Sequence, residues 1–402
     1  MLRQRVELNS GKLKVLAYLM IGMLAIAAVP RSLAVEPPPP PAAASEPFFK
    51  AAPDWPRKLP NDWTLGVISG VAVDQRGHVW INHLTIVLGA DTDAARQGLA
   101  GKPDNYAPPI VEFDQDGNFV RGWGGPGPGY DWPTYPHGLF VDHKGFVWIG
   151  GNNQNDRQLL KFTSEGKFVA QLGRVGAASG ALKTRQLGRA ANFFVDARTN
   201  ELYVADGYGN RRIIVFDADT LKFKRMWGAY GNPPVDPAPD ALSNFYHSDP
   251  HDPQDQPPPH FNSPVHCVGV TTDRLVYVCD RTNNRVQVFH TDGRFVREFF
   301  LDRDSPANGL MVKGGAPTDV AFWPDANQTY LLVGDANNKE VVVMQRRDGK
   351  LVSRFGQPGH GPGQFHLLHM MAIDSNGNLY TGDVDKRVQK WIPQPGVAPP
   401  TR

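Results

Sequence analysis

The stretch ANFFVDARTNELYVADGYGNRRIIVFDADTLKFKRMWG, residues 191–228, contains four short runs in which apolar and polar residues alternate. Asp, Asn, Thr and Gly residues, which favour turns, separate these runs. A period of two with such punctuation is typical of β-strands joined by hairpins. The stretch therefore predicts four consecutive antiparallel strands, the last of which ends at Trp227 and Gly228.

The same frame recurs along the chain, and nothing in it has the period of a long helix. Further copies span residues 70–124, 138–173, 267–300, 319–356 and 371–392. Six units of four antiparallel strands predict an all-β fold, a six-bladed β-propeller. A seventh unit would need residues 231–260, which are too rich in Pro and Asp to pair as strands.

The last copy stops at Ile392 with three recognisable strands. We expect its missing outer strand to come from the N-terminal side, within residues 54–67, because this closure removes an exposed edge. The predicted propeller then spans 54–392, and residues 393–402 form a tail.

Residues 1–34 differ in composition from the rest of the chain. A basic start precedes the apolar run VLAYLMIGMLAIAAV, and Ser32-Leu33-Ala34 has the small-x-small pattern of a cleavage site. The run is short for a membrane span, so we expect a removed signal peptide; the alternative is an uncleaved anchor. Residues 35–53 are rich in Pro and Ala and predict an extended linker. We therefore expect a periplasmic or secreted protein without stable membrane insertion after leader removal.

The charge of the mature chain excludes one class of partner. Without residues 1–34 the chain has 37 basic and 39 acidic residues, since the leader holds five basic residues and one acidic residue. Such a balance gives no electrostatic footprint for nucleic acid. We expect a monomer that binds a small molecule or a peptide.

The chain has two cysteines, Cys267 and Cys279, on either side of a hairpin centred on Asp273. They lie opposite each other in the predicted register, so an oxidising compartment would allow a disulfide. Two buried thiols that act as small core residues are the alternative. The sequence leaves both possibilities open.

Three histidines occupy one position of the repeat in alternate copies. His137, His266 and His369 each lie four residues before the last aliphatic residue of a first strand. Ser69, Ala191 and Thr318 hold this position in the intervening copies. In a closed ring of six blades, three imidazoles about 120° apart around the axis form a ligand set for a divalent metal.

The loops between second and third strands return to the face on which the histidines lie. They read DGYGNRR and DRTNNR in two neighbouring copies, and they bring Tyr208 and Arg281 to this mouth. A tyrosine near a divalent cation can serve as a base, and an arginine can bind a carboxylate. Asp206 and Asp280, which precede these residues, are better explained as structural residues that fix the loops.

Each of these residues taken singly is more often a packing or turn residue than a catalytic one. Their common register on one face favours a site. Two long segments, 83–108 and 231–262, return to the same mouth. His247, His251 and His260 in the second of these are irregularly spaced on a Pro-rich loop, which favours a solvated flap over a second metal site.

These motifs resemble the peptidyl-α-hydroxyglycine α-amidating lyases, six-bladed propellers of the NHL-repeat class, over residues 65–392. The resemblance implies that His137 in YPHGLFVD, His266 in SPVHCVGV and His369 in LLHMMAID hold zinc. It also implies that Tyr208 in ADGYGNRR is the catalytic base and that Arg281 in CDRTNNR is an active-site arginine. The pattern looks even more like that of bacterial exported NHL-repeat proteins.

Two departures from the lyase pattern bear on function. The lyases carry an arginine after a histidine in the second strand of the first blade, where this chain has Leu84 after His83. The lyases also carry an aspartate that helps bind calcium after the third zinc histidine, where this chain has Met370. The resemblance predicts lyase-like cleavage of a carbinolamide, without support for calcium. The alternative is a non-catalytic propeller that binds a peptide or glycan; a lactonase is a third reading.

Overall fold

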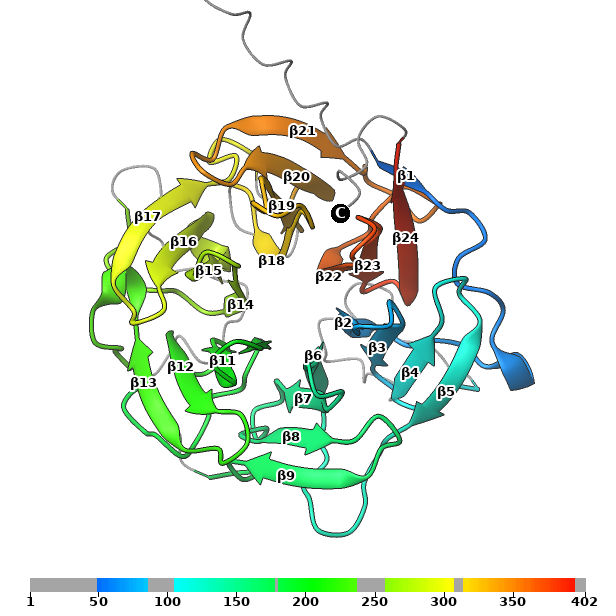
Figure 1. Ribbon diagram of the computed structural model, residues 1–402, viewed down its shortest axis with the longest axis horizontal. Helices are drawn as coiled ribbons and strands as arrows, with labels where there is room; N and C mark the ends of the chain where they lie inside the picture. Colours follow the sequence, from blue (N-terminus) through cyan, green and yellow to red (C-terminus); the bar gives the residue numbers. More distant parts are fainter. Residues whose placement is uncertain (1–48, 86–104, 178–179, 237–256, 307–313, 395–402) are drawn as a thin grey trace, which may run out of the picture. The chain divides into compact units, whose positions relative to one another are not determined.

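The computed structural model describes residues 49–85, 105–177, 180–236, 257–306 and 314–394. These residues form six four-stranded antiparallel sheets around a common axis, as Figure 1 shows. The predicted all-β, six-bladed propeller is thus confirmed. The signal peptide predicted at residues 1–34 lies outside the described residues. Within the described ranges, no helix is long and apolar enough to cross a membrane.

Each of the first five blades consists of four successive strands, and the first of these lies nearest the axis (Figure 1). Blades one to three comprise β2 (Ile68–Val73), β3 (Val79–His83), β4 (Ile110–Phe113) and β5 (Phe119–Trp123); β6 (Pro136–Val141), β7 (Val147–Gly151), β8 (Leu159–Phe162) and β9 (Phe168–Leu172); and β10 (Asn192–Asp196), β11 (Glu201–Asp206), β12 (Arg212–Asp217) and β13 (Phe223–Trp227). Blades four to six comprise β14 (Val265–Val270), β15 (Leu275–Asp280), β16 (Arg285–His290) and β17 (Phe295–Phe300); β18 (Pro317–Phe322), β19 (Tyr330–Asp335), β20 (Glu340–Gln345) and β21 (Leu351–Phe355); and β22 (Leu368–Ile373), β23 (Leu379–Asp383) and β24 (Arg387–Pro393) with β1 (Phe49–Ala51).

The strand that closes the ring is β1, which pairs antiparallel with β24 and places Phe49 opposite Pro393. Our prediction that this strand lies within residues 54–67 is therefore wrong. The propeller begins inside the segment 35–53 that its composition marked as a linker. The physical reason is packing, since the Phe49 ring lies 4.7 Å from that of Phe355 and 5.9 Å from that of Trp323.

Residues 54–67 stabilise the closure in another way. The Trp55 ring lies 5.7 Å from that of Phe113 in blade one and 5.0 Å from that of Tyr380 in blade six. Trp55 is buried, so the segment covers the seam between the first and last blades with apolar surface. This burial removes the seam from water.

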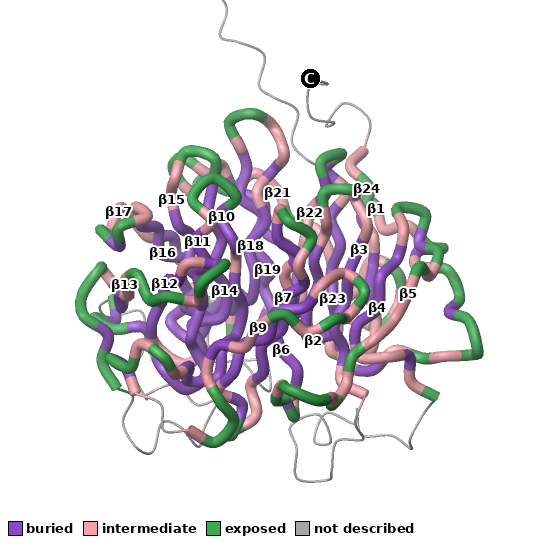
Figure 2. The backbone as a smooth tube through the Cα atoms, turned by 60° about the horizontal axis from the view of Figure 1, so that its bottom comes forward, coloured by how far each residue is buried: buried purple, intermediate pink, exposed green. Residues whose placement is uncertain are grey.

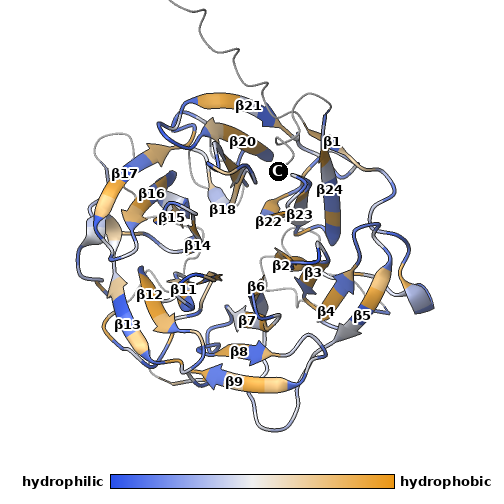
Figure 3. Ribbon diagram, viewed as in Figure 1, coloured by the Kyte–Doolittle hydropathy of each residue, from blue (hydrophilic) through white to orange (hydrophobic). Residues whose placement is uncertain are grey.

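The hydrophobic core lies between neighbouring blades rather than at one central point. One cluster, for example, joins Tyr203 and Val215 of blade three to Val276 and Val278 of blade four. Figure 2 shows the buried residues concentrated in the strands, with exposed residues in the loops at both faces of the ring. The strands alternate apolar and polar residues along their length (Figure 3). Each blade therefore buries its two faces against its neighbours.

The innermost strands share an irregularity close to their start. In blades one, two, four, five and six, the pairing of the first strand with the second shifts by one residue there. Such a β-bulge leaves one residue without a partner on the next strand and turns its side chain to a new direction. His266 and His369 are the residues that the shift skips. In blade two the shift skips Gly138, directly after His137, so the bulges lie at or next to the position of the repeat that carries the histidines.

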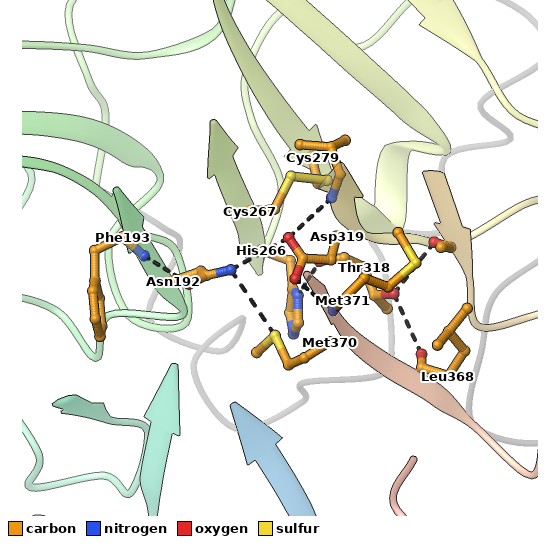
Figure 4. Close-up of a disulfide and its surroundings, with 12 residues drawn as sticks. Asn192, Phe193, His266, Cys267, Cys279, Thr318, Asp319, Leu368, Met370 and Met371 are labelled. Carbon is orange, nitrogen blue, oxygen red and sulfur yellow. Dashed lines mark hydrogen bonds between the residues drawn. A yellow bond between two sulfur atoms is a disulfide. The ribbon is translucent and has the colours of Figure 1, made fainter. Parts of the chain in front are cut away.

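The two cysteines form a disulfide, which resolves the alternatives that the sequence left open. Cys267 of β14 pairs directly with Cys279 of β15, and a disulfide joins their sulfur atoms (Figure 4). Both residues are fully buried. The bond ties the strand that carries His266 to the strand that leads into Asp280 and Arg281.

Candidate metal centre

Three histidines from blades two, four and six meet near the axis. One ring nitrogen of each of His137, His266 and His369 lies within 4.8 Å of the others. Nε2 of His137 is 3.2 Å from Nε2 of His369. All three side chains are buried. The expected convergence of the three imidazoles is thus present.

The second nitrogen of each ring faces a backbone carbonyl of the next blade. Nδ1 of His137 lies 2.8 Å from the Ala191 oxygen, and Nδ1 of His266 lies 2.6 Å from the Thr318 oxygen. Nδ1 of His369 lies 3.0 Å from the Ile68 oxygen. A carbonyl only accepts hydrogen bonds, so each Nδ1 carries the ring proton. Each Nε2 is therefore an acceptor, which is the arrangement that metal-binding histidines have.

A glycine next to the first histidine makes this geometry possible. Gly138 has a φ of +74°, and a Cβ atom there would lie 2.8 Å from the Ala191 oxygen. That oxygen is the one that faces Nδ1 of His137. Any other residue at position 138 would disturb the carbonyl that orients the imidazole.

Burial keeps the three imidazoles neutral. It lowers the pKa of His137 and of His266 well below the ordinary value, and nearby positive charge on His369 or Arg281 adds to the effect. Burial also lowers the pKa of His369 to about 4. Neutral imidazole is the form that binds metals, so the cluster requires no deprotonation at neutral pH. The residues therefore suit a divalent ion, and zinc accepts such nitrogen ligands.

Tyr208 reaches the histidines from the loop between β11 and β12. Its hydroxyl oxygen lies 3.1 Å from Nε2 of His137 and 3.1 Å from Nε2 of His266. Burial raises the pKa of Tyr208, and the charge of Arg281 opposes that effect. The predicted proximity of tyrosine and histidines is present in the structure.

Arg281 lies at the start of a short 3₁₀ turn that follows β15. Its side chain is buried and forms a hydrogen bond with that of Tyr208. The preceding Asp280 accepts hydrogen bonds from the Asn262 amide, from Asn283 and from Arg285, at 2.8 to 2.9 Å. These contacts hold the turn that presents Arg281 at the mouth.

Asp206 fixes the Tyr208 loop by the same set of contacts. It accepts hydrogen bonds from the Gly188 amide at 2.6 Å, from Asn210 at 2.8 Å and from Arg212 at 2.9 Å. Both Asp206 and Arg212 are fully buried. The structural role expected for the two aspartates agrees with these contacts.

Two neighbours of Tyr208 escaped the sequence analysis. The side chain of Asn152, which follows β7, forms a hydrogen bond with the Tyr208 side chain. Arg189, which precedes β10, donates a hydrogen bond from Nη2 to the Tyr208 carbonyl at 2.5 Å. Their common signal is position, because both lie in loops that return to the mouth of the histidine cluster.

Leu84 occupies the position at which the lyases carry an arginine, and His83 precedes it. His83 accepts a hydrogen bond from the Gly66 amide at Nδ1 and faces the Pro108 oxygen through Nε2, each at 3.0 Å. Burial lowers the pKa of His83 to about 4. His83 therefore ties loops together, and Leu84 adds no charge to the site. Met370 is buried in the core cluster between blades one and six.

Two further groups of side chains could offer ligands to a metal ion, namely Asp74, His78 and Glu112, and Asp302, Asp335 and Glu340. In both groups an arginine already pairs with the carboxylates. Arg76 forms ion pairs with Asp74 and Glu112 in the first, and Arg354 forms ion pairs with Asp302 and Glu340 in the second. His247 and His251 lie outside the described residues. His260 is exposed, and its backbone oxygen accepts hydrogen bonds from Asn283 and Arg285. The three-histidine cluster is the buried candidate in the described ranges.

Comparison with known proteins places this site in context. A family model described as the NHL repeat matches residues 263–289, which include His266, both cysteines and Arg281. NHL repeat-containing protein 3 of Mus musculus is 27% identical over 366 residues, which cover 87% of this chain and 85% of that protein. Peptidyl-glycine alpha-amidating monooxygenase B of Xenopus laevis is 24% identical over 250 residues, which cover 62% of this chain and 25% of that protein.

Solved structures agree with the fold. A Bacteroides thetaiotaomicron protein of unknown function has a TM-score of 0.52 and 14% identity, and the match covers 87% of this chain and 77% of that one. A streptogramin B lyase has a TM-score of 0.50 and 11% identity over 87% of this chain and 98% of that one. At such low identity these matches support the fold alone. The chain is thus a six-bladed β-propeller with an NHL-repeat match at residues 263–289, and it is similar to NHL repeat-containing protein 3 and, over a shorter stretch, to a peptidyl-glycine alpha-amidating monooxygenase.

Proposed function

We propose that the protein is a metal-dependent lyase that cleaves the N–C bond of a carbinolamide of the N-acyl-α-hydroxyglycine type. The observation that carries the proposal is the approach of the Tyr208 hydroxyl to Nε2 of His137 and of His266. The relation to amidating monooxygenases supports the same chemistry. A small molecule or a peptide with this end group is the proposed substrate.

The three histidines would hold the metal through Nε2, and zinc is the proposed ion. A bound divalent ion polarises a substrate hydroxyl or carboxylate oxygen and favours the ionised form of a nearby phenol. The backbone carbonyls that face the three Nδ1 atoms keep each ring in the required orientation.

Tyr208 is the proposed base. As phenolate it takes the proton from the substrate hydroxyl, and the oxygen then forms the C=O bond of glyoxylate. The C–N bond breaks with its electron pair on nitrogen, and this nitrogen receives a proton to become the primary amide. Arg281 and Asn152, whose side chains contact the phenol, position it and offset part of the effect of burial on its pKa.

Arg281 is the proposed partner of the substrate carboxylate, because a guanidinium offers paired donors to two carboxylate oxygens. Leu84 removes a second such group from blade one. We therefore propose that this chain holds the carboxylate less firmly than a lyase with two arginines. The natural acyl group can be identified by measuring glyoxylate release from N-acyl-α-hydroxyglycines that differ in this group.

A non-catalytic propeller that binds a peptide or glycan is the second candidate. Leu84 favours it, and so does the relation to NHL repeat-containing protein 3 over most of both chains. We also propose that the protein acts after export to the periplasm or the medium, as its first 34 residues suggest.

The decisive experiment measures glyoxylate release from N-benzoyl-α-hydroxyglycine by zinc-loaded protein and by its Tyr208→Phe variant. A lyase releases equal amounts of glyoxylate and benzamide, and the variant loses this turnover while it keeps its metal. A zinc-loaded parent without turnover of several N-acyl-α-hydroxyglycines would favour the binding propeller.

A further inference from the structure

A cavity lies between the innermost strands of the ring, beyond the three histidines. Its volume is about 390 Å³, and it is lined by residues of all six innermost strands, each of which lies after the repeat position that carries the histidines. The histidines lie near the start of the same strands, and none of them lines this cavity. The cavity is thus separate from the candidate metal centre. Its size lies within the range of about 300 to 1,000 Å³ that is usual for small-molecule pockets.

Most of the residues that line this distal cavity are apolar. They include Val71, Leu139, Phe140, Phe194, Val268 and Met371. Phe140 and Phe194, whose rings lie 5.0 Å apart, are half-buried. Apolar walls of this kind favour a ligand with a hydrocarbon body, because its burial removes apolar surface from water.

Polar residues also line the cavity, namely Asn192, Asp319, Gln328, Asp374 and Ser375. Asn192 follows the repeat position of the histidine ring in blade three, and Asp319 follows it in blade five. Figure 4 shows the two side chains directed toward each other, with Asn192 Nδ2 3.4 Å from Asp319 Oδ1. Both residues line the cavity, and both are buried.

Among the described residues, the groups that contact the Asp319 carboxylate carry no positive charge. Oδ1 accepts the Val320 amide and Oδ2 accepts the Met371 amide, each at 2.9 Å. The two backbone amides and the Asn192 side chain are neutral hydrogen-bond donors. Burial raises the pKa of Asp319 to about 7. A buried carboxylate is costly unless a positive charge pairs with it, so this group favours a cationic ligand.

We propose that the distal cavity binds a small organic cation, with an apolar body against the walls and an ammonium head group on Asp319 and the amide oxygen of Asn192. The amide oxygen accepts the Phe193 amide at 2.9 Å and has a second lone pair for the ligand. An anion is disfavoured by the carboxylate. A calcium ion is disfavoured because calcium takes about six to eight oxygen ligands, and the surrounding walls are hydrocarbon.

Calorimetric titration with three probes of equal length tests this assignment. n-Hexylammonium, n-hexanol and n-hexanoate are compared at about pH 8.5, where a carboxyl of raised pKa is ionised and an alkylammonium is still charged. We expect the ammonium to bind at least about tenfold more tightly than the alcohol, and hexanoate to bind most weakly. Equal affinity for ammonium and alcohol, or no binding of the ammonium, would overturn the proposal.

Variants locate the binding. Asp319→Asn removes the charge with little change of shape, so the affinities for ammonium and alcohol should become equal. Asp374→Asn is the matched control, since Asp374 also lines the cavity while its carboxylate accepts the Asn376 and Asn378 amides of its own turn. This control should keep the preference, and so should His266→Ala. Loss of the preference in Asp374→Asn alone would contradict the assignment.

A second variant and a competing ion keep the test decisive. Asn192→Ala leaves the carboxylate in place and removes one acceptor, so it should weaken ammonium binding without abolishing it. Calcium chloride is titrated in parallel. Tight calcium binding that depends on Asp319 and excludes hexylammonium would show an inorganic cation site and overturn the proposed organic ligand.

Discussion

Nε2 of His137 and Nε2 of His369 lie 3.2 Å apart, although 232 residues separate them in the chain. Both Nδ1 atoms donate to carbonyl oxygens, so the two lone pairs face each other. Two facing lone pairs repel each other, and a positive charge between the two nitrogens would turn this repulsion into attraction. Burial opposes a proton there, since it lowers the pKa of His369 to about 4. A metal ion is the better partner for this pair.

Replacement of His266 with Ala should therefore abolish binding at the proposed metal site. We expect the parent to bind one divalent ion per chain and the variant to bind it at least about a hundredfold more weakly, because an entire ligand is lost. Elemental analysis of protein purified without affinity tags or chelators measures the content, and titration with zinc measures the affinity.

His360→Ala is the matched control for this measurement. His360 is exposed and contacts Asp385 at the surface, so its loss should leave the metal content unchanged. An equal loss in both variants, or a parent that cannot be loaded with any divalent ion, would contradict a three-histidine metal centre.

Replacement of Tyr208 with Phe separates chemistry from metal binding. The ring still packs against His137, and only the hydroxyl is lost. Since a general base contributes about 10² to 10⁴ in rate, we expect kcat for glyoxylate release to fall at least a hundredfold with metal content unchanged. Rates and metal content are measured on the same preparations. A variant that retains full turnover would exclude Tyr208 as the base.

The fold and the histidine cluster were predictable because both follow from a repeat. Strand alternation sets the four strands of a blade, and ring closure carries His137, His266 and His369 to one axis without knowledge of other contacts. The loops that present Tyr208 and Arg281 follow from the same topology. These features depend on position within a repeat, which a sequence displays directly.

The closing strand and the distal cavity depend instead on contacts between distant segments. The β1 strand has three residues, and its pairing with β24 depends on the Phe49 contacts with blade five. Nothing in its own sequence distinguishes it from linker. Asp319 reads as an ordinary strand residue until ring closure places Asn192 beside it. Such pairs have no local signal in the sequence, because the two partners come together only when the ring closes.

Removal of the disulfide should destabilise the propeller and disturb the metal centre. The bond closes a short loop with a sequence separation of 12. A loop of this size predicts a loss of about 3 kcal/mol in the free energy of unfolding from chain entropy. Zinc affinity should fall as well, because Cys267 follows His266 directly.

Denaturant unfolding compares the parent with the Cys267→Ala, Cys279→Ala double variant, and the reduced parent serves as control for lost side-chain volume. Agreement between the reduced parent and the double variant would assign the loss to the bond. Unchanged stability after verified reduction would contradict the prediction.

The pH dependence of stability should reveal Asp319. Burial raises its pKa to about 7 from the ordinary value of 3.8. Between these values the folded protein holds a proton that the unfolded chain has released. Since the folded state binds more protons, the contribution of this group to stability falls as pH rises from about 4 to about 7 and is constant above the folded pKa. This pKa difference changes the free energy of unfolding by at most about 4 kcal/mol.

Asp319→Asn isolates this contribution, because the amide does not titrate and all other groups are shared with the parent. The free energy of unfolding of the parent, minus that of the variant, should therefore fall across this pH window. Its absolute level includes the cost of placing an amide N–H near the Met371 amide, so the slope carries the prediction. Denaturant unfolding at a series of pH values gives this difference. Parallel curves for the two proteins would show that the carboxyl titrates normally in the fold, and the distal cavity would then lack the buried charge that favours an ammonium ligand.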